Sequence, residues 1–162
     1  MRIRPATEED IEAIVALLAD DPLGRAREVP GDPAYATAFA AMARQEGNVL
    51  LVAVTEEDTA GAAKGALLGC LQLTLIHGLS RRGMLRAQIE GVRVAEAARG
   101  TGLGRKLVED AIARARAAGC GLVQLTTDKR RPDAHRFYMA LGFEATHEGM
   151  KLSLPVGDGG DG

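Results

Sequence analysis

Residues 99–107 read RGTGLGRKL, with glycines at 100, 102 and 104 and basic side chains on both flanks. An amphipathic pattern follows at once, so the glycines form a loop that opens a helix. A glycine backbone approaches a ligand closely, and the N–H groups at a helix N-terminus attract anions. These residues are typical of a pyrophosphate-binding loop. A tight strand-to-helix turn that binds nothing is the alternative.

Two familiar phosphate-binding patterns do not fit this stretch. The P-loop requires Gly-Lys-Ser/Thr, whereas Gly104 is followed by Arg105, Lys106 and Leu107, so the magnesium-binding hydroxyl is missing. The dinucleotide-binding pattern requires GxGxxG at the first strand-to-helix turn. Here the spacing is GxGxG, and the order of strands differs. Neither a P-loop nor a dinucleotide site is therefore expected.

The order of a strand, Arg-x-x-Gly-x-Gly and a helix strongly resembles the acyl-CoA loop of the GNAT superfamily of N-acetyltransferases. The matching residues are Arg99, Gly102 and Gly104. A second segment, AHRFYMALGF at 134–143, resembles another motif of the family through Ala134, Phe137, Tyr138, Gly142 and Phe143. The opening IRPATEEDIEAIVALL resembles the first strand and helix of the family. The resemblance spans roughly residues 1–154.

The resemblance implies acetyl-CoA as co-substrate and no metal. It implies that the backbone of Val92 and Val94 pairs with the pantetheine amides, and that the N–H groups of residues 99–104 hold the pyrophosphate. The full set of implied cofactor-binding residues is Val92, Val94, Arg99, Gly100, Thr101, Gly102, Leu103, Gly104, Arg105 and Phe137.

The implied reaction is direct transfer of acetyl to an amine of a small molecule or a peptide. Tyr138 matches the general acid that protonates the CoA sulfur, although it could merely pack beside Phe137. Glu90 lies on the strand beside the expected thioester and is the candidate base. It could instead bind a cationic acceptor or form a structural ion pair with Arg93 or another arginine. The alternative function is a non-catalytic acyl-CoA-binding regulatory module.

The elements that must position these residues follow from hydrophobic periodicity. Helices are expected from Thr7, from Asp32–Pro33, over 102–118 and over 132–141. Strands are expected over 1–6, 48–54, 65–76, 85–94 and 122–127, with a closing pair in FEATH (143–147) and MKLSL (150–154). The family resemblance implies an α/β (α+β) fold. Its central twisted sheet would be mixed but mostly antiparallel, with about 6–7 strands, about 4 helices and a splay around a bulged central strand.

The strand at 85–94 has a phase problem. Ile89 and Val92 differ by an odd number, so a regular strand would place them on opposite faces. An extra residue at Glu90–Gly91 would bring both onto one face, and glycine tolerates such a bulge most easily. A β-bulge is therefore predicted at this point.

Composition narrows the remaining possibilities. A chain of 162 residues suits one domain, expected over 1–154 with a disordered tail at 155–162. The net charge of −2 gives no positive field for nucleic acid. Cys70 and Cys120 lack paired spacing for zinc and suit a reducing compartment. No long apolar stretch is present, so a cytoplasmic protein without membrane contact is expected.

Two features bear on partners. The C-terminal strands would offer a route to a homodimer. The acceptor site is expected to be walled by residues 22–48 and 77–86. Within the second segment, Arg81, Arg82 and Arg86 would favour an acceptor with a carboxylate or phosphate, or else form a solvated loop.

Overall fold

The computed structural model describes residues 1–20, 25–58 and 61–154 of the chain. The chain divides into two compact units, Met1–Leu125 and Thr126–Gly162. The expected disordered tail at 155–162 lies outside the described residues, as do parts of two predicted loops.

The first unit is built on one five-stranded sheet, ordered β1-β2-β3-β4-β5. The strands are β1 (Arg2–Pro5), β2 (Asn48–Val54), β3 (Leu67–Ile76), β4 (Arg86–Val94) and β5 (Leu122–Leu125). The pairings from β1 to β4 are antiparallel, and β4 pairs with β5 in parallel. The sheet is therefore mixed and mostly antiparallel, as predicted.

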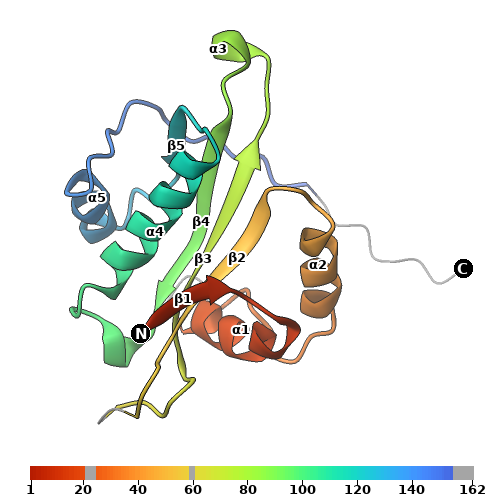
Figure 1. Ribbon diagram of the computed structural model, residues 1–162, viewed down its shortest axis with the longest axis vertical. Helices are drawn as coiled ribbons and strands as arrows, with labels where there is room; N and C mark the ends of the chain where they lie inside the picture. Colours follow the sequence, from red (N-terminus) through yellow and green to blue (C-terminus); the bar gives the residue numbers. More distant parts are fainter. Residues whose placement is uncertain (21–24, 59–60, 155–162) are drawn as a thin grey trace, which may run out of the picture. The chain divides into compact units, whose positions relative to one another are not determined.

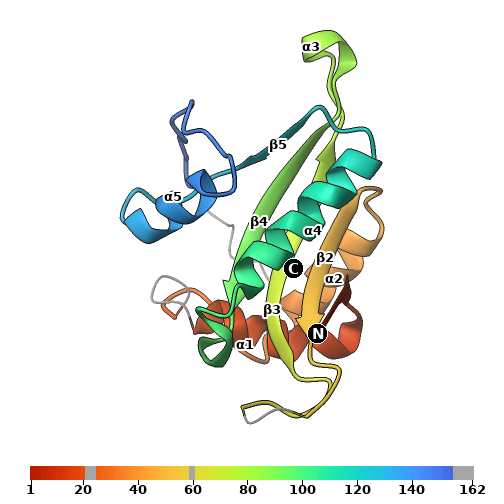
Figure 2. The ribbon, with the colours of Figure 1, turned by 60° about the vertical axis from the view of Figure 1, so that its left-hand side comes forward.

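Helices cover both faces of this sheet. The first unit holds α1 (Ile11–Ala19), α2 (Ala34–Ala43), the short α3 (Ser80–Gly83) and α4 (Leu103–Ala117), and the second holds α5 (Pro132–Met139). Short 3-10 turns occupy Glu8–Asp10 and Glu96–Ala98. Figures 1 and 2 show α4 across one face of the sheet and α1 and α2 across the other. We call these the α4 face and the α1/α2 face.

The two faces bury different apolar layers. The layer on the α4 face consists of Leu71, Leu73, Ala87 and Ile89 from the sheet and Leu103, Leu107, Val108, Ala111 and Ala115 from the helix, all buried. On the α1/α2 face, Ile14 packs with Val52, Val54 and Cys70. Because α4 is anchored by this apolar stripe, the position of its N-terminus is fixed relative to β3 and β4.

An ion pair fixes the start of α1. The Arg4 guanidinium donates to both carboxylate oxygens of Asp10, with Nη1–Oδ2 at 2.6 Å and Nη2–Oδ1 at 2.9 Å. The backbone N–H of Thr7 also donates to Asp10 Oδ2, at 2.7 Å. The hydrogen bonds from Arg4 dominate in holding the pKa of Asp10 below its ordinary value. The first turn predicted from Thr7 is thus a 3-10 turn that leads into α1.

The predicted closing pair of strands is wrong. No strand occurs between residues 143 and 154, so the described part of the chain has five strands rather than six or seven. In this segment, Met150, Leu152 and Leu154 are 95%, 86% and 75% exposed. Alternating apolar residues form a strand only where a partner edge and a burying face exist. MKLSL does alternate apolar and polar residues, but within the described residues it pairs with no strand edge and its apolar side chains are not buried.

Candidate active site

The predicted bulge lies in the middle of β4. Gln72 of β3 stands opposite Glu90, and Cys70 stands opposite Arg93, so the single intervening Leu71 faces both Gly91 and Val92. Gly91 has a φ of +60°, the left-handed conformation that the extra glycine of a bulge adopts. The bulge returns Val92 to the face occupied by Ile89. The prediction made from the phase of these two residues is confirmed.

The pairing of β4 with β5 ends just before this bulge. It runs from Arg86 with Leu122 to Ile89 with Leu125. Beyond Ile89, no strand within the described part of Met1–Leu125 pairs with this side of β4. We call residues 90–94 on this side the open edge of β4. The parallel pairing therefore stops next to the bulge, at the place where the family resemblance implies that the two strands separate.

The backbone groups of Val92 and Val94 lie along the open edge. The Ala95 N–H donates to the Leu68 carbonyl of β3 at 2.8 Å. Because the backbone N–H and C=O groups of alternate residues point toward and away from the partner strand, those of Val94 and Val92 point away from β3. Two arginine side chains donate hydrogen bonds to the backbone carbonyl oxygens along this edge. Arg93 Nη1 donates to Val92 at 2.9 Å, and Arg99 Nε donates to Val94 at 3.4 Å. A ligand with its own amides could pair with this edge as an added strand would.

The open edge leads to the glycine loop. Gly100 and Gly102 have φ values of +77° and +84°, which only glycine adopts without strain, and a β-carbon at either would meet no atom within 4 Å. Gly102 is the N-cap of α4 and offers no side-chain cap. The first helical hydrogen bond runs from Lys106 N–H to Gly102 at 3.1 Å, so the N–H groups of Leu103 and Gly104 lack helical partners. This backbone is suited to an anion.

Gly69 sets how closely α4 approaches the sheet. It stands opposite Val94, and a β-carbon there would lie 2.9 Å from Leu107 Cδ1 and 3.0 Å from the Arg93 carbonyl oxygen. A larger residue would therefore push α4 away from the end of the open edge. The absence of a side chain on β3 brings the glycine loop and the open edge together.

The side chains of the predicted loop residues differ in how freely they could contact a bound cofactor. The hydroxyl of Thr101 donates to the Ala98 carbonyl at 2.7 Å, which closes the turn before the helix. The side chain of Leu103 is buried in the core, so only its backbone faces the loop. Arg99 pairs with Asp20 at 3.2 Å, and Arg105 pairs with Glu109 at 3.2 Å. Both arginines are half exposed, so these pairs can open at little cost in free energy.

Glu90 lies at the start of the open edge, one residue before the bulge. Its side chain is exposed, on the same face as Gln72 of β3. It forms no ion pair with Arg93 or with any other residue in the described ranges, so the structural ion pair considered from the sequence is not formed there. A carboxylate in this position is open to an incoming amine.

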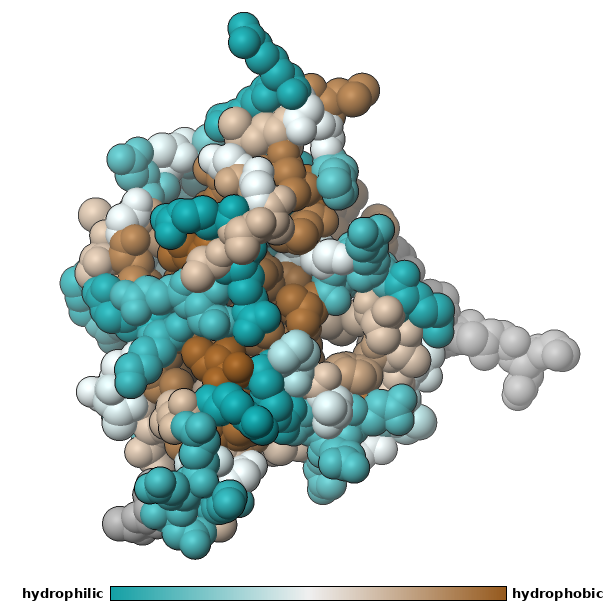
Figure 3. All heavy atoms as spheres, viewed as in Figure 1, coloured by the Kyte–Doolittle hydropathy of each residue, from teal (hydrophilic) through white to brown (hydrophobic). Residues whose placement is uncertain are grey.

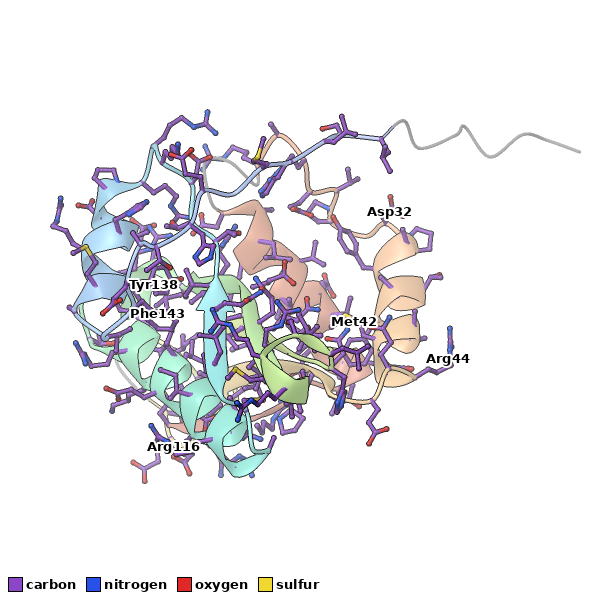
Figure 4. The ribbon with its side chains drawn as sticks, turned by 90° about the horizontal axis from the view of Figure 1, so that it is seen from above. Asp32, Met42, Arg44, Arg116, Tyr138 and Phe143 are labelled. Carbon is purple, nitrogen blue, oxygen red and sulfur yellow. The ribbon has the colours of Figure 1, made fainter. Side chains whose placement is uncertain are left out.

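Tyr138 and Phe137 belong to the second unit, on α5. The Tyr138 ring packs edge-on against Phe137, with ring centroids 5.0 Å apart, and against Phe143, with centroids 5.8 Å apart. Figure 4 labels Tyr138 and Phe143, which lie side by side. The Phe143 N–H donates to the Tyr138 carbonyl at 3.1 Å. The conformation of this aromatic cluster is set by the turn that ends α5.

The two cysteine side chains both lie in the first unit. Cys70 is fully buried, and burial raises the pKa of its thiol to about 11. Cys120 is half-buried, and both cysteines are free. Over residues 1–20, 25–58 and 61–154, no three His, Cys, Asp or Glu side chains gather in a group that could hold a metal. Over the same ranges, no helix has the length and apolar character to cross a membrane.

Comparison with known proteins decides the family. Residues 11–143 match the acetyltransferase (GNAT) family. The chain belongs to this family. The GNAT assignment made from Arg99, Gly102, Gly104 and the segment around Tyr138 is therefore confirmed, as is the GNAT-like fold class.

Three relatives show how this GNAT chain compares. A crystal structure of a transcriptional regulator from Bacillus halodurans C-125 is 47% identical, with a TM-score of 0.86 over 94% of this chain and 99% of that chain. A glucosamine 6-phosphate N-acetyltransferase of Trypanosoma brucei brucei is 28% identical over 95% of this chain and 96% of its own length. An aminoalkylphosphonate N-acetyltransferase of Salmonella typhimurium strain LT2 is 32% identical over 51% of this chain and 53% of its own length. The predicted enzyme class, an N-acetyltransferase, is confirmed.

Sequence reasoning missed two features of this GNAT site. One is the pair between Arg99 and Asp20, which joins the glycine loop to the end of α1. The other is a set of polar side chains that meet across four strands on the α1/α2 face. The polar positions 72 and 74 within QLTLI gave a signal for the second feature. The register between strands, which brings these side chains together, could not be obtained from one strand alone.

Proposed function

We propose that this chain transfers the acetyl group of acetyl-CoA directly to the primary amine of a small molecule. The observation that carries the proposal is the open edge of β4, which begins at the Gly91 bulge and leads to the glycine loop of α4. Pantetheine amides are suited to the backbone of Val92 and Val94. A pyrophosphate is suited to the N–H groups at the start of α4, assisted by Arg99 and Arg105.

The proposed chemistry assigns one role to each group. The neutral amine attacks the thioester carbonyl carbon, a C–N bond forms, and the C–S bond breaks. Glu90 takes the proton that the amine must lose, directly or through water, because its carboxylate lies at the bulge. Tyr138 gives a proton to the departing sulfur, as the family resemblance implies. The products are the N-acetyl amide and free CoA.

We also propose that the two compact units act as one acetyltransferase domain over residues 1–154. The family match supports this, because it runs from residue 11 to 143 and so crosses the boundary between Leu125 and Thr126. The proposed general acid, Tyr138, lies in the second unit and the glycine loop lies in the first, so the proposed reaction requires both units.

The two N-acetyltransferase relatives guide the choice of acceptor. One acts on glucosamine 6-phosphate and the other on aminoalkylphosphonates, so both acceptors carry an amine and a phosphoryl anion. We propose a small amine with an anionic group as the first class to test. The alternative, a regulatory module that binds acyl-CoA without turnover, receives some support from the Bacillus halodurans relative, which is named a transcriptional regulator.

The test combines binding with turnover. Acetyl-CoA should raise the melting temperature, because a ligand of the native state must stabilise it. A screen of amino sugars, aminophosphonates, amino acids, polyamines and peptides should then release free thiol with at least one acceptor. Stabilisation without thiol release from any amine would favour the regulatory module. Neither stabilisation nor release would contradict both functions.

A further inference from the structure

A row of polar side chains crosses the sheet on the α1/α2 face. Gln124 of β5 stands opposite Gln88 of β4, Gln88 opposite Thr74 of β3, and Thr74 opposite Asn48 of β2. We call these four residues the polar row, and all four are half-buried. A mostly antiparallel sheet can carry polar side chains on one face, so the polar row is compatible with folding. On this face, however, α1 and α2 also contact β2, β3 and β4, and the half-buried amides beside them are placed to bind a polar ligand.

Hydrogen bonding divides the polar row into a closed end and an available end. At the closed end, Asn48 Oδ1 accepts from Gln72 Nε2 at 3.0 Å and from the Thr74 hydroxyl at 3.3 Å, and Asn48 Nδ2 donates to Gln45 Oε1 at 2.6 Å. At the other end, Gln124 Nε2 donates to Gln88 Oε1 at 2.7 Å. Among the described residues, the Gln88 amide donors and the Gln124 oxygen have no further partner. These two side chains offer both donors and acceptors.

Strand β4 adds a charge at each side of Gln88. Because strand side chains alternate between the two faces, Arg86, Gln88 and Glu90 all lie on the α1/α2 face. Arg86 and Glu90 are four residues apart, which corresponds to about 13 Å along the strand. The register places Arg86 between the apolar residues Ile76 and Leu122. Within the described ranges, neither Arg86 nor Glu90 forms a side-chain hydrogen bond or an ion pair. The strand thus presents a cation, a neutral amide and an anion in line.

The α3 turn strengthens the positive end. It directly precedes β4 and carries Arg81 and Arg82, whose φ values of +54° and +60° are left-handed. Such conformations are strained for residues other than glycine and concentrate at functional sites. Figure 3 shows hydrophilic side chains projecting from this tip of the first unit.

From this arrangement we infer that the acceptor is a hydroxyl-bearing amine with an anionic phosphoryl group at its far end, such as an amino sugar phosphate. Its amine lies at Glu90, its hydroxyls bind Gln88 and Gln124, and its phosphoryl group binds Arg86. Carboxamides match hydroxyls because both donate and accept, and a guanidinium matches the geometry of phosphate. The inference rests on the proposed function and adds the acceptor class and its direction along β4.

Three acceptors separate the parts of this inference. Glucosamine 6-phosphate has the amine, the hydroxyls and the phosphoryl group, glucosamine lacks the phosphoryl group, and 2-aminoethylphosphonate lacks the hydroxyls. The kcat/KM for glucosamine 6-phosphate should exceed that for each of the others by about tenfold or more. Equal values for glucosamine and its phosphate would overturn the role of the anion. Equal values for glucosamine 6-phosphate and the phosphonate would overturn the role of the hydroxyls.

Two variants assign these preferences to residues. Arg86→Gln should lower the preference for glucosamine 6-phosphate over glucosamine by roughly tenfold, because a charge-assisted pair is lost. Gln88→Leu should lower the preference for glucosamine 6-phosphate over 2-aminoethylphosphonate. Arg116→Gln, an exposed arginine on α4, is the matched control and should change neither ratio (Figure 4). Unchanged ratios in both test variants would contradict the placement along β4.

Failure of this inference is distinguishable from failure of the proposed function. Turnover of an amine that has neither hydroxyls nor an anion, with none of the three acceptors used, would overturn the inference and leave the proposed function standing. No turnover of any amine would contradict the proposed function itself.

Discussion

The Arg99 guanidinium faces the Asp20 carboxylate, with Nη2 and Oδ2 3.2 Å apart, and so joins the glycine loop to the C-terminus of α1. Both side chains are half exposed, at 56% and 44%. An exposed pair of this kind is weak, and a bound pyrophosphate would compete with Asp20 for the same guanidinium. The pair is therefore expected to oppose cofactor binding.

Asp20→Asn should consequently bind acetyl-CoA more tightly, by roughly two- to fivefold at low ionic strength. The gain should shrink as salt is added, because the charges are exposed. Isothermal titration calorimetry at two salt concentrations measures this. Asp110→Asn is the matched control, since it removes an equal charge from an ion pair with Arg114 within α4. Weaker binding by the Asp20 variant would show that Asp20 supports the cofactor site rather than opposing it.

Gly91→Ala tests the bulge. Because a β-carbon at Gly91 would meet no atom within 4 Å, the expected loss of stability, about 1–2 kcal/mol, comes from the left-handed backbone alone. Gly91→Asn should lose less, because asparagine visits this conformation more readily. Urea denaturation measures both. Gly78→Ala has equal space and no left-handed φ, so it is the control. Equal effects of alanine at 91 and 78 would contradict the role given to the bulge.

Asp10→Asn tests the ion pair that precedes α1. At neutral pH the variant should lose about 2 kcal/mol of unfolding free energy, because the Arg4 guanidinium loses a bidentate partner. The folded-state pKa of Asp10 is lowered, so its contribution is complete above the unfolded pKa of about 3.9 and disappears as the pH falls through the lower folded pKa. Denaturation between pH 7 and pH 2 should therefore show the two proteins converging in acid. A constant difference would contradict this assignment.

Tyr138→Phe tests the general acid. The substitution keeps the ring that packs against Phe137 and Phe143 and removes only the hydroxyl. The kcat should fall on the order of 100-fold or more, with the dissociation constant of acetyl-CoA nearly unchanged. Turnover measured beside calorimetric binding separates the two effects. Unchanged kcat would assign Tyr138 to packing, the alternative that its sequence context left open.

Local sequence signals predicted much of the first unit. The odd spacing of Ile89 and Val92 predicted the bulge, because a strand has a strict period of two. The helix predicted over 102–118 ends as expected, because Gly119 follows it with a φ of +82° that allows the Cys120 N–H to donate to the Ala115 carbonyl at 2.9 Å. Asp32 marked the start of α2, and its carboxylate accepts from Ala34 N–H at 2.8 Å. Each of these signals depends on only a few neighbouring residues.

Features that depend on distant parts of the chain were not predicted. The polar row depends on the register between β2, β3, β4 and β5, which no single strand contains. Asp20 and Arg99 are 79 residues apart in the sequence, and only the folded unit brings them together. The closing strands failed for a related reason. The alternation in MKLSL is compatible with a strand, but a strand forms only where a neighbouring strand edge is available for pairing, and a single sequence segment does not show this.

The central claim is that acetyl passes from acetyl-CoA to an acceptor amine. Incubation of the protein with carbon-labelled acetyl-CoA and glucosamine 6-phosphate, followed by mass spectrometry of the acceptor and assay of free thiol, tests it most directly. We predict one labelled acetyl amide formed for each CoA released, at a rate that depends on the protein. Thiol release without acetyl on any amine across the acceptor screen, or no release at all, would contradict it.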